Sequence, residues 1–166
     1  MIKLLEAKSN YLAVNAQSNS ANLGFNFATK YKSPSFITMD VPELQYAVSD
    51  RFSEVPVLAE KLYAKAHFNK FLVTMGKNGV DYFNSGEQTL FPAFVTRPID
   101  TVGAGDAVLA ITSLFAYCGY DELIPFIANC TGGIAVSYMG NKKFITKEDM
   151  LDFIEQVYNG DKQLSS

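Results

Sequence analysis

Short apolar runs and amphipathic stretches alternate along this chain of 166 residues. Apolar runs of four or five residues between turn residues are typical of buried strands, whereas apolar residues three and four positions apart are typical of helices. The runs predict buried strands at residues 11–15, 36–39 and 71–75. They also predict a β-hairpin, which residues 80–83 and 88–91 form around Ser85 and Gly86.

The helical pattern predicts seven helices around these strands. They are expected at residues 2–9, 19–31, 44–48, 57–68, 107–117, 123–138 and 146–158. The helix at 107–117 is apolar on nearly all sides, so it is expected to be central and buried. The pair Gly132 and Gly133 suits close packing between helices. Thr146 is a suitable cap for the last helix, which has acidic residues in its first turn.

Strands that alternate with helices are typical of an α/β domain with a mostly parallel sheet. The length of the chain is sufficient for one domain with a substantial core. Ligands of such sheets bind at the carboxyl ends of the strands. Polar clusters follow Val14, Met39 and Met75, at the ends of the expected strands, and another precedes the helix at 107–117. The sequence therefore predicts a ligand site at this edge of the sheet.

Composition and charge argue against several classes of partner. Hydrophobic residues make up 48% of the chain and charged residues 19%, as in ordinary globular proteins. The net charge of −3 provides no basic surface for nucleic acid. No apolar run is long enough to cross a membrane, and residues 1–6 lack the apolar core of a secretory signal. We therefore expect a cytoplasmic protein that binds neither nucleic acid nor membranes.

The few cysteine and histidine residues argue against two kinds of catalytic site. Cys118 and Cys130 lie in apolar surroundings without metal-binding spacing, so both are expected to be buried, reduced thiols. His67 is the only histidine of the chain and is expected to be partly exposed at a helix end. A zinc site or a histidine-based triad would have to rest on this one residue.

The segment Asp100-Thr101-Val102-Gly103-Ala104-Gly105-Asp106 directly precedes an apolar helical run. Its glycines let the backbone approach a ligand closely, and free N–H groups at a helix start bind anions. Asp106, in the first helical turn, can accept a proton from a hydroxyl group. Turn and cap chemistry alone also explains many Gly-x-Gly-Asp sequences. A dinucleotide fingerprint fails because Val108 stands where it needs glycine, and the chain has no Gly-Lys-Ser/Thr tripeptide for a Walker A loop.

This seven-residue segment resembles the Asp-Thr-x-Gly-Ala-Gly-Asp signature of the ribokinase-like (PfkB) carbohydrate kinases. The resemblance implies that Asp106 is the catalytic base and that the backbone of Gly103, Ala104 and Gly105 forms an anion hole. It also implies a ribokinase-like, Rossmann-type fold of three α/β/α layers. ATP and Mg²⁺ are the implied cofactors, and a sugar or sugar phosphate is the implied acceptor.

The loop from Thr74 to Gly79 also resembles this family. It is similar to the Thr-Leu-Gly-x-x-Gly loop that packs against the phosphates and ribose of the nucleotide. The resemblance implies nucleotide contacts for Thr74, Gly76, Lys77 and Gly79. Taken alone, the same residues suit a glycine turn between two strands.

Asp40-Val41-Pro42-Glu43 resembles the family's Asn-x-x-Glu motif, which orders phosphate and magnesium largely through water. The match implies a metal-linked role for Glu43 and a place near the phosphates for Asp40. Asp40 stands where the family has asparagine, and it adds a negative charge there. Taken alone, Glu43 is also a suitable acid for a first helical turn.

Residues 128–136 resemble the late helix that lines the adenine pocket, with Asn129 as the matching polar residue. In some members of the family, backbone carbonyl groups bind a monovalent cation. Ala135, Tyr138 and Gly140 match those positions, and Asp100 is implied as a metal ligand of the same site. An asparagine within a helix also occurs for packing or capping reasons alone.

The resemblance extends over roughly residues 10–157 but corresponds only to the C-terminal half of the family's fold. Residues 1–159 are therefore expected to be the nucleotide-binding and catalytic half of a sugar kinase, and residues 160–166 a disordered tail. The N-terminal half, which carries most sugar-binding residues and a β lid, has no counterpart in the chain. We expect the chain to form a homo-oligomer or to need a partner segment, and this fragment alone need not be active.

An amide-rich stretch at residues 14–26, together with residues 139–143, resembles the heptose-kinase-like branch, in which kinase and nucleotidyltransferase domains can be fused. These amides equally suit caps and turns. Two functions therefore remain open. One is an ATP-dependent sugar kinase, which the intact Asp106 favours. The other is an ATP-binding domain of a larger enzyme that does not transfer phosphate, which the missing sugar half favours.

Overall fold

The computed structural model describes five stretches of the chain. They are residues 2–15, 27–66, 68–95, 99–137 and 144–160. The chain folds into two compact units. Unit 1 comprises residues 1–74 and 81–89, and unit 2 comprises residues 75–80 and 90–166.

Five strands form one mixed sheet whose order follows the chain. The strands are β1 (Ala13–Asn15), β2 (Phe36–Asp40), β3 (Lys70–Thr74), β4 (Val80–Asn84) and β5 (Glu87–Phe91). β1, β2 and β3 are parallel, and Ile37 lies opposite Val14 on one side and Phe71 on the other. β4 and β5 are neighbours joined by a turn at Ser85 and Gly86, so they are antiparallel. The structure thus confirms the parallel strands and the hairpin expected from the sequence.

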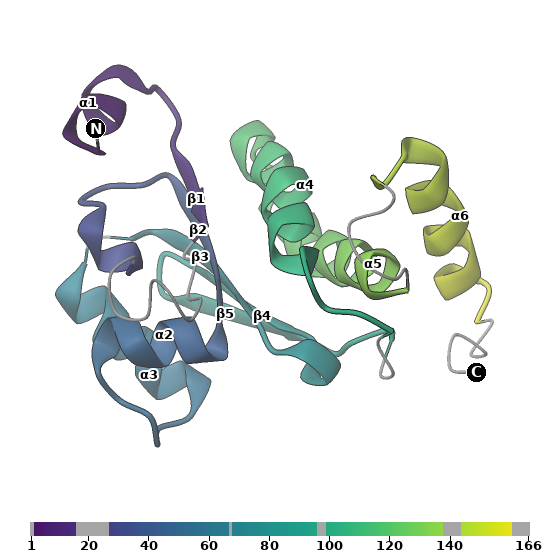
Figure 1. Cartoon of the computed structure of the whole chain (residues 1–166), viewed down its shortest axis with the longest axis horizontal. Helices are drawn as coiled ribbons and strands as arrows, with labels where there is room; N and C mark the ends of the chain where they lie inside the picture. Colours follow the sequence, from purple (N-terminus) through teal and green to yellow (C-terminus); the bar gives the residue numbers. More distant parts are fainter. Residues whose placement is uncertain (1, 16–26, 67, 96–98, 138–143, 161–166) are drawn as a thin grey trace. The chain divides into compact units, whose positions relative to one another are not determined.

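Two helices of unit 1, α2 (Val41–Val48) and α3 (Val55–Lys65), pack against each other beside the parallel strands (Figure 1). α2 begins after Asp40, which forms a reciprocal capping box with Glu43. α3 ends at Lys65 rather than at Phe68, because the backbone of Ala66 is extended. The chain then turns, and Phe68 is buried ahead of β3. The sequence prediction extended this helix too far because Phe68 continues its apolar pattern.

The other helical segments of unit 1 are short. α1 spans Ile2–Lys8, as expected, and buries none of its residues. Of the helix expected at 19–31, residues 19–26 lie outside the described residues. In the described residues 27–31 the expected α-helix is wrong, because Phe27 and Tyr31 are extended and only the 3₁₀ turn η1 (Ala28–Lys30) lies between them.

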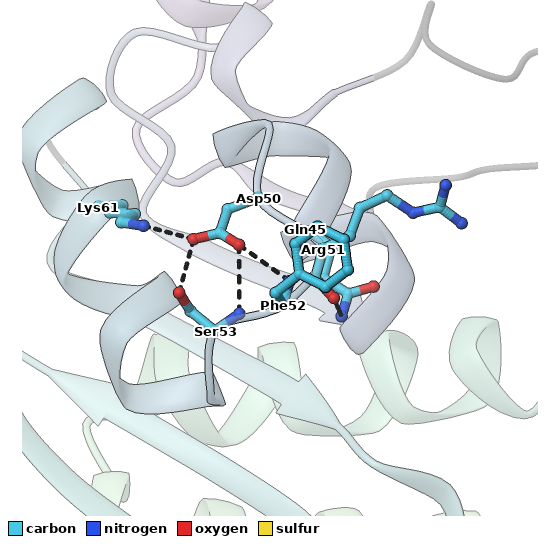
Figure 2. A network of polar contacts seen from close by, with 6 residues as sticks. All are labelled: Gln45, Asp50, Arg51, Phe52, Ser53 and Lys61. Atoms are coloured by element: carbon cyan, nitrogen blue, oxygen red, sulfur yellow. Dashed lines mark hydrogen bonds and ion pairs between the residues drawn. The ribbon is translucent and has the colours of Figure 1, made fainter.

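The loop between α2 and α3 is organised by Asp50 (Figure 2). Its carboxylate accepts hydrogen bonds from Phe52 N at 2.9 Å, from Ser53 N at 3.2 Å and from Ser53 Oγ at 2.6 Å. Lys61 of α3 forms an ion pair with the same carboxylate. The Lys61 ammonium, together with these donors, holds the pKa of Asp50 well below its usual range. One carboxylate therefore joins α3, through Lys61, to the loop that precedes the helix.

The core of unit 1 lies between the sheet and the two helices. Phe71 of β3 stacks on Phe83 of β4, with ring centroids 4.7 Å apart, and contacts Tyr63 of α3. Burying such apolar and aromatic surface is the main force that holds these elements together. The largest fully buried apolar side chains of this unit are Phe36, Ile37, Met39, Leu44, Leu58, Leu62, Phe68, Phe71, Leu72 and Val73.

Unit 2 contains a group of three described α-helices. They are α4 (Ala104–Cys118), α5 (Ile124–Val136) and α6 (Lys147–Tyr158). α5 packs against both α4 and α6 (Figure 1). Cys130, Ile134 and Phe153 form the core between α5 and α6. Burial raises the pKa of the Cys130 thiol to about 12, which agrees with the expected buried, reduced cysteine. The 3₁₀ turns η2 (Gly76–Asn78) and η3 (Asp121–Leu123) complete the unit.

Two expectations for α4 are wrong. The helix was expected to be buried on nearly all sides, but its buried residues are Val108, Thr112 and Ala116. These positions are four residues apart and form one stripe, whereas Leu114 and Tyr117 are 63% and 67% exposed. Cys118 was expected to be buried, but it is exposed at the last residue of the helix.

Several expectations fall outside the described residues. They concern His67, Tyr138, Gly140, the tail beyond Gly160 and most of the amide-rich stretches at 14–26 and 139–143. Among the described helices, none combines the length and apolar character needed to cross a lipid bilayer.

Candidate functional site

The Asp100–Asp106 segment forms the turn that leads into α4. Gly103 precedes the helix with φ +80°, a left-handed conformation that side chains disfavour, and Ala104 is the first helical residue. Because Gly103 has no side chain, it cannot cap the first N–H groups of α4, unlike Asp40 at α2. The Ala104 N–H donates to Thr101 O at 3.3 Å. An uncapped helix start otherwise offers its first N–H groups and its positive dipole end to an anion.

Asp106 lies in this first turn of α4 and is exposed. It is the third helical residue, three positions after Gly103. The backbone folds as the sequence predicted, with a carboxylate beside a helix N-terminus. This arrangement allows a base and an anion-binding backbone to act on one bound molecule.

Asp40, Glu43 and Thr74 lie together in unit 1, at the carboxyl ends of β2 and β3. Asp40 is paired with Thr74 in the parallel register. Asp40 Oδ1 accepts a hydrogen bond from Glu43 N at 2.7 Å, and Glu43 Oε2 accepts one from Asp40 N at 2.9 Å. Burial raises the pKa of Asp40, and the hydrogen bond from Glu43 N partly offsets this effect. Helix capping by itself thus accounts for the position of both carboxylates.

The loop at residues 76–79 lies in unit 2 and ends at Gly79. Gly79 is buried at φ +93° against the backbone that follows β5. A Cβ atom at this position would lie 2.0 Å from the carbonyl oxygen of Phe91 and 2.7 Å from Ala93 N. Gly76, Lys77 and Asn78 are exposed in the 3₁₀ turn η2. Glycine is therefore required at the buried end of the loop, while Lys77 is presented to solvent.

Asn129 lies on α5, and its side chain contacts the same backbone. Its Nδ2 donates to Pro125 O at 3.0 Å and to Phe91 O at 3.4 Å. Phe91 O is thus adjacent both to Gly79 and to the Asn129 amide. The structure thus brings the buried end of the 76–79 loop and Asn129 to one carbonyl group.

Asp100 lies near the C-terminal end of α5. Its backbone N–H donates to Val136 O at 3.3 Å, and its Oδ1 accepts a hydrogen bond from Val102 N at 2.9 Å. Asp100 therefore lies close to Val136, the residue that follows Ala135. Ala135 is one of the expected carbonyl donors of a cation site. The other two expected donors, Tyr138 and Gly140, lie outside the described residues.

The expected site residues divide between the two units. Asp40, Glu43 and Thr74 belong to unit 1, and the other expected residues belong to unit 2. Within the described residues, no three His, Cys, Asp or Glu side chains are grouped as a metal site. A magnesium ion that is bound chiefly by phosphate oxygens and water needs only one or two carboxylates. Glu43 and Asp40 fit that mode of binding.

Sequence reasoning missed two residues near these elements. Phe91 was assigned only to a strand, although its carbonyl group connects Gly79 with Asn129. Asp81 is buried on β4, and its Oδ2 accepts a hydrogen bond from Gln88 at 2.8 Å. A carboxylate within an apolar strand was a visible signal for Asp81. No side-chain pattern could have revealed the backbone role of Phe91.

Residues 6–143 match the model of the pfkB family of carbohydrate kinases. The chain therefore belongs to this family. The match confirms the resemblance that the seven-residue segment indicated.

The relatives that match in sequence include an uncharacterized sugar kinase and several bifunctional proteins. The chain is 30% identical over 117 residues to an uncharacterized sugar kinase of Buchnera aphidicola, covering 68% of this chain and 37% of that protein. It is 31% identical over 120 residues to the bifunctional protein HldE of Geobacter metallireducens, covering 69% of this chain and 24% of that protein. The chain thus spans well under half the length of these relatives. The second match is consistent with the heptose-kinase-like branch.

Solved structures share the fold over about half their length. Phosphofructokinase-2 from Escherichia coli in complex with potassium superposes with a TM-score of 0.76 at 16% identity, covering 95% of this chain and 50% of that one. Ribokinase from Thermotoga maritima gives a TM-score of 0.71 at 20% identity, covering 92% and 52%. A double mutant of fructokinase from Vibrio cholerae, bound to fructose, ADP and potassium, gives 0.72 at 16% identity, covering 92% and 53%. The fold is therefore ribokinase-like, as expected.

Proposed function

We propose that this chain supplies the nucleotide site, the anion hole and the catalytic base of an ATP-dependent carbohydrate kinase. The observation that carries the proposal is the exposed Asp106 in the first turn of α4, after the left-handed Gly103. Membership of the pfkB family supports the proposal.

Asp106 acts as the base in this reaction. Its carboxylate takes the proton of a sugar hydroxyl while the hydroxyl oxygen bonds to the transferred phosphorus and the bond to the nucleoside diphosphate breaks. The N–H groups of Gly103, Ala104 and Gly105 stabilise negative charge on the transferred group. Because these groups are fixed by the helix start, they need little reorganisation during the reaction.

The nucleotide binds along the 76–79 loop and α5. Gly76, Lys77 and Gly79 face its phosphates and ribose, with Thr74 at the start of the loop, and Asn129 lies beside the base. The contacts of Gly79 and Asn129 with Phe91 O support a single binding surface within unit 2.

Glu43 would hold Mg²⁺, with Asp40 beside it in unit 1. A bound Mg²⁺ would neutralise charge on the phosphate oxygens. Their capping bonds to each other's backbone fix both carboxylates relative to β2. Asp100, together with Ala135, would contribute to a monovalent cation site at the end of α5.

The sugar is bound by a segment beyond this chain, because the solved structures that share the fold are about twice as long. That segment is the N-terminal half of the fold, in the same polypeptide or in a partner, and the chain alone is expected to associate with it or with itself. The same difference in length favours a second candidate function. In this alternative, the chain is an ATP-binding domain that does not transfer phosphate.

The test combines binding with phosphoryl transfer. Calorimetric titration with Mg²⁺ and a non-hydrolysable ATP analogue is expected to show saturable one-to-one binding. Transfer from ATP to a panel of sugars is then compared for wild type, Asp106→Asn and the exposed control Asp152→Asn. A loss of about 10²–10⁴-fold in Asp106→Asn alone would support the kinase. Transfer is measured on the chain joined to its sugar-binding half, because the chain alone is expected to be incomplete. Binding without transfer in that longer protein would favour the second function, and no binding by the folded chain would contradict both.

A further inference from the structure

β5 forms one end of the sheet, so one side of this strand has no neighbouring strand among the described residues. Its first four side chains, from Glu87 to Leu90, are exposed. Since successive side chains of a strand point to opposite faces of the sheet, neither face is covered along this part of β5. The open side and the two uncovered faces leave room for another strand to lie beside β5.

The hairpin determines which backbone groups of β5 face β4. Ser85 and Gly86 form a two-residue turn with positive φ at both positions, the type of turn that suits antiparallel strands. The residues that flank such a turn face each other with their backbone groups, so those of Glu87 point toward β4. Because this pattern repeats at every second residue, the odd-numbered residues of β5 face β4 and the even-numbered ones face away.

The position of Phe91 agrees with this alternation. Its carbonyl oxygen lies against Gly79, the residue directly before β4, so Phe91 faces inward like Glu87. The backbone N–H and C=O groups of Gln88 and Leu90 therefore point to the open side. Such a row of unpaired backbone groups is a template for another strand.

β5 lacks the features that usually keep edge strands apart. Natural edges are commonly protected by lysine, by proline or by a bulge. The strand Glu87–Phe91 contains neither lysine nor proline, and its one charged residue stands at its start. Pro92 follows directly, so pairing is limited to the five residues of the strand.

We propose that β5 is a self-association surface, on which the same strand of a second copy pairs antiparallel about a two-fold axis at Thr89. In this register Gln88 lies opposite Leu90 of the second copy, so the outward backbone groups of both strands are satisfied by about four hydrogen bonds. Glu87 lies opposite Phe91, whereas a parallel pair in register would place the two Glu87 carboxylates side by side. Because the antiparallel pair has two-fold symmetry, the assembly closes as a dimer.

Neither the nucleotide nor Asp106 takes part in this pairing, so the dimer is independent of the proposed function. One pair of short strands buries little surface, below the roughly 1,200 Å² at which stable specific interfaces begin. The dimer is therefore expected to be reversible and to dissociate on dilution. Sedimentation at several chain concentrations measures its dissociation constant.

The first test measures the register by cross-linking. On the axis, the Cα atoms of the two Thr89 residues are expected about 4.5 Å apart, a distance that suits a disulfide. Thr89→Cys, combined with Cys118→Ser to remove the exposed native thiol, should form a covalent dimer under oxidising conditions. Glu87→Cys in the same background is the matched control, because its two copies would be about 14 Å apart. It should form far less covalent dimer, and equal yields or no dimer of Thr89→Cys would overturn the register.

The second test places charges on the two-fold axis. Thr89→Lys and Thr89→Glu each put two like charges opposite each other, so each should raise the dissociation constant about fivefold or more. An equal mixture of these two variants should form a dimer at least as stable as that of the wild type. Gln156→Lys and Gln156→Glu, at an exposed position of α6, should leave the dissociation constant unchanged.

Two results would overturn the proposal. One is a wild-type chain that stays monomeric at millimolar concentration. The other is a dimer that neither charge at position 89 weakens, since such a dimer would form through another surface. Both results would leave nucleotide binding and phosphoryl transfer untouched, so the failure of this dimer and the failure of the proposed function are separate findings.

Discussion

Gly79 lies so close to Phe91 that a Cβ atom at position 79 would come within 2.0 Å of the Phe91 carbonyl oxygen. Real Cβ contacts are never that short. Because the Phe91 oxygen belongs to the backbone and cannot rotate away, a side chain at position 79 would displace either the 76–79 loop or the backbone at Phe91. The closeness of these residues sets the position of the 76–79 loop relative to Asn129, which donates to the same carbonyl.

Gly79→Ala is therefore expected to lower the free energy of unfolding by about 3 kcal/mol or more, since it adds a steric clash to an unfavourable φ. Gly119→Ala is the matched control, because Gly119 has φ +78° but no heavy atom within 4 Å of an added Cβ. It should cost only about 1–2 kcal/mol, the price of the left-handed backbone alone. Urea denaturation of both variants measures the difference, and equal losses would contradict the close contact.

The two adjacent glycines of α5 should respond differently to alanine. A Cβ at Gly133 would lie 2.8 Å from Phe153 Cζ and 3.2 Å from Val95 Cγ2, whereas the nearest atom to a Cβ at Gly132 is Val108 Cγ2 at 3.9 Å. Gly133→Ala should lower the free energy of unfolding by about 1–2 kcal/mol through overpacking. Gly132→Ala should raise it by about 0.5–1 kcal/mol, because alanine favours the helix.

The same urea experiment checks both glycine variants. Phe153→Leu shortens the side chain that opposes Gly133. Gly133→Ala should therefore lower the free energy of unfolding less in the Phe153→Leu variant than it does in the wild type. If Gly132→Ala proved the more damaging variant, the packing of α5 would be different from that described.

The periodicity of the sequence was sufficient to predict most of the strands and helices, because most of them have a strong local signal, but the helix expected at 19–31 is only a 3₁₀ turn in its described part. Strands at 11–15, 36–39 and 71–75 and the hairpin at Ser85 and Gly86 were all confirmed. Periodicity failed where tertiary packing decides. Phe68 continues the pattern of α3 but belongs to the turn into β3, and Leu114 is as apolar as a core residue yet is exposed.

The candidate site could be predicted only in part. The seven-residue segment identified the turn before α4, and the Asp40–Glu43 capping box follows directly from residue types and spacing. Gly79 and Asn129, which are far apart in the sequence, both contact the backbone carbonyl group of Phe91. Every residue has such a carbonyl group, so its presence carries no sequence signal. No sequence pattern encodes such a contact, since it depends on how β5 leads into the following segment.

Asp50 and Lys61 provide a test of the loop between α2 and α3. Asp50→Ala should remove the hydrogen-exchange protection of the Phe52 and Ser53 amides, since both N–H groups donate to its Oδ1. Lys61→Met should leave most of that protection, because the carboxylate keeps its three donors from Phe52 and Ser53. Exchange measured by NMR distinguishes the two variants. Equal loss in both would mean that the ion pair, rather than the carboxylate's backbone contacts, organises the loop.

Asp81 should contribute to the pH dependence of the free energy of unfolding. Burial raises the pKa of this carboxyl, and the hydrogen bond from Gln88 offsets the effect only in part. The native state then binds more protons than the unfolded state as pH rises above the ordinary value of 3.8. Stability is therefore lost as pH rises through the native pKa, because the ionised carboxylate is costly in the core.

Asp81→Asn keeps the shape of this side chain and removes its ionisation. Relative to wild type, the free energy of unfolding of Asp81→Asn should increase as pH rises from 3 to neutrality. The buried Nδ2 of the new amide adds a cost that does not vary with pH, so the slope and not the absolute difference is diagnostic. Asp152→Asn, at an exposed position of α6, should show no such slope. Urea denaturation at several pH values measures it, and parallel curves for wild type and Asp81→Asn would mean that the buried carboxylate is better stabilised than its contact with Gln88 suggests.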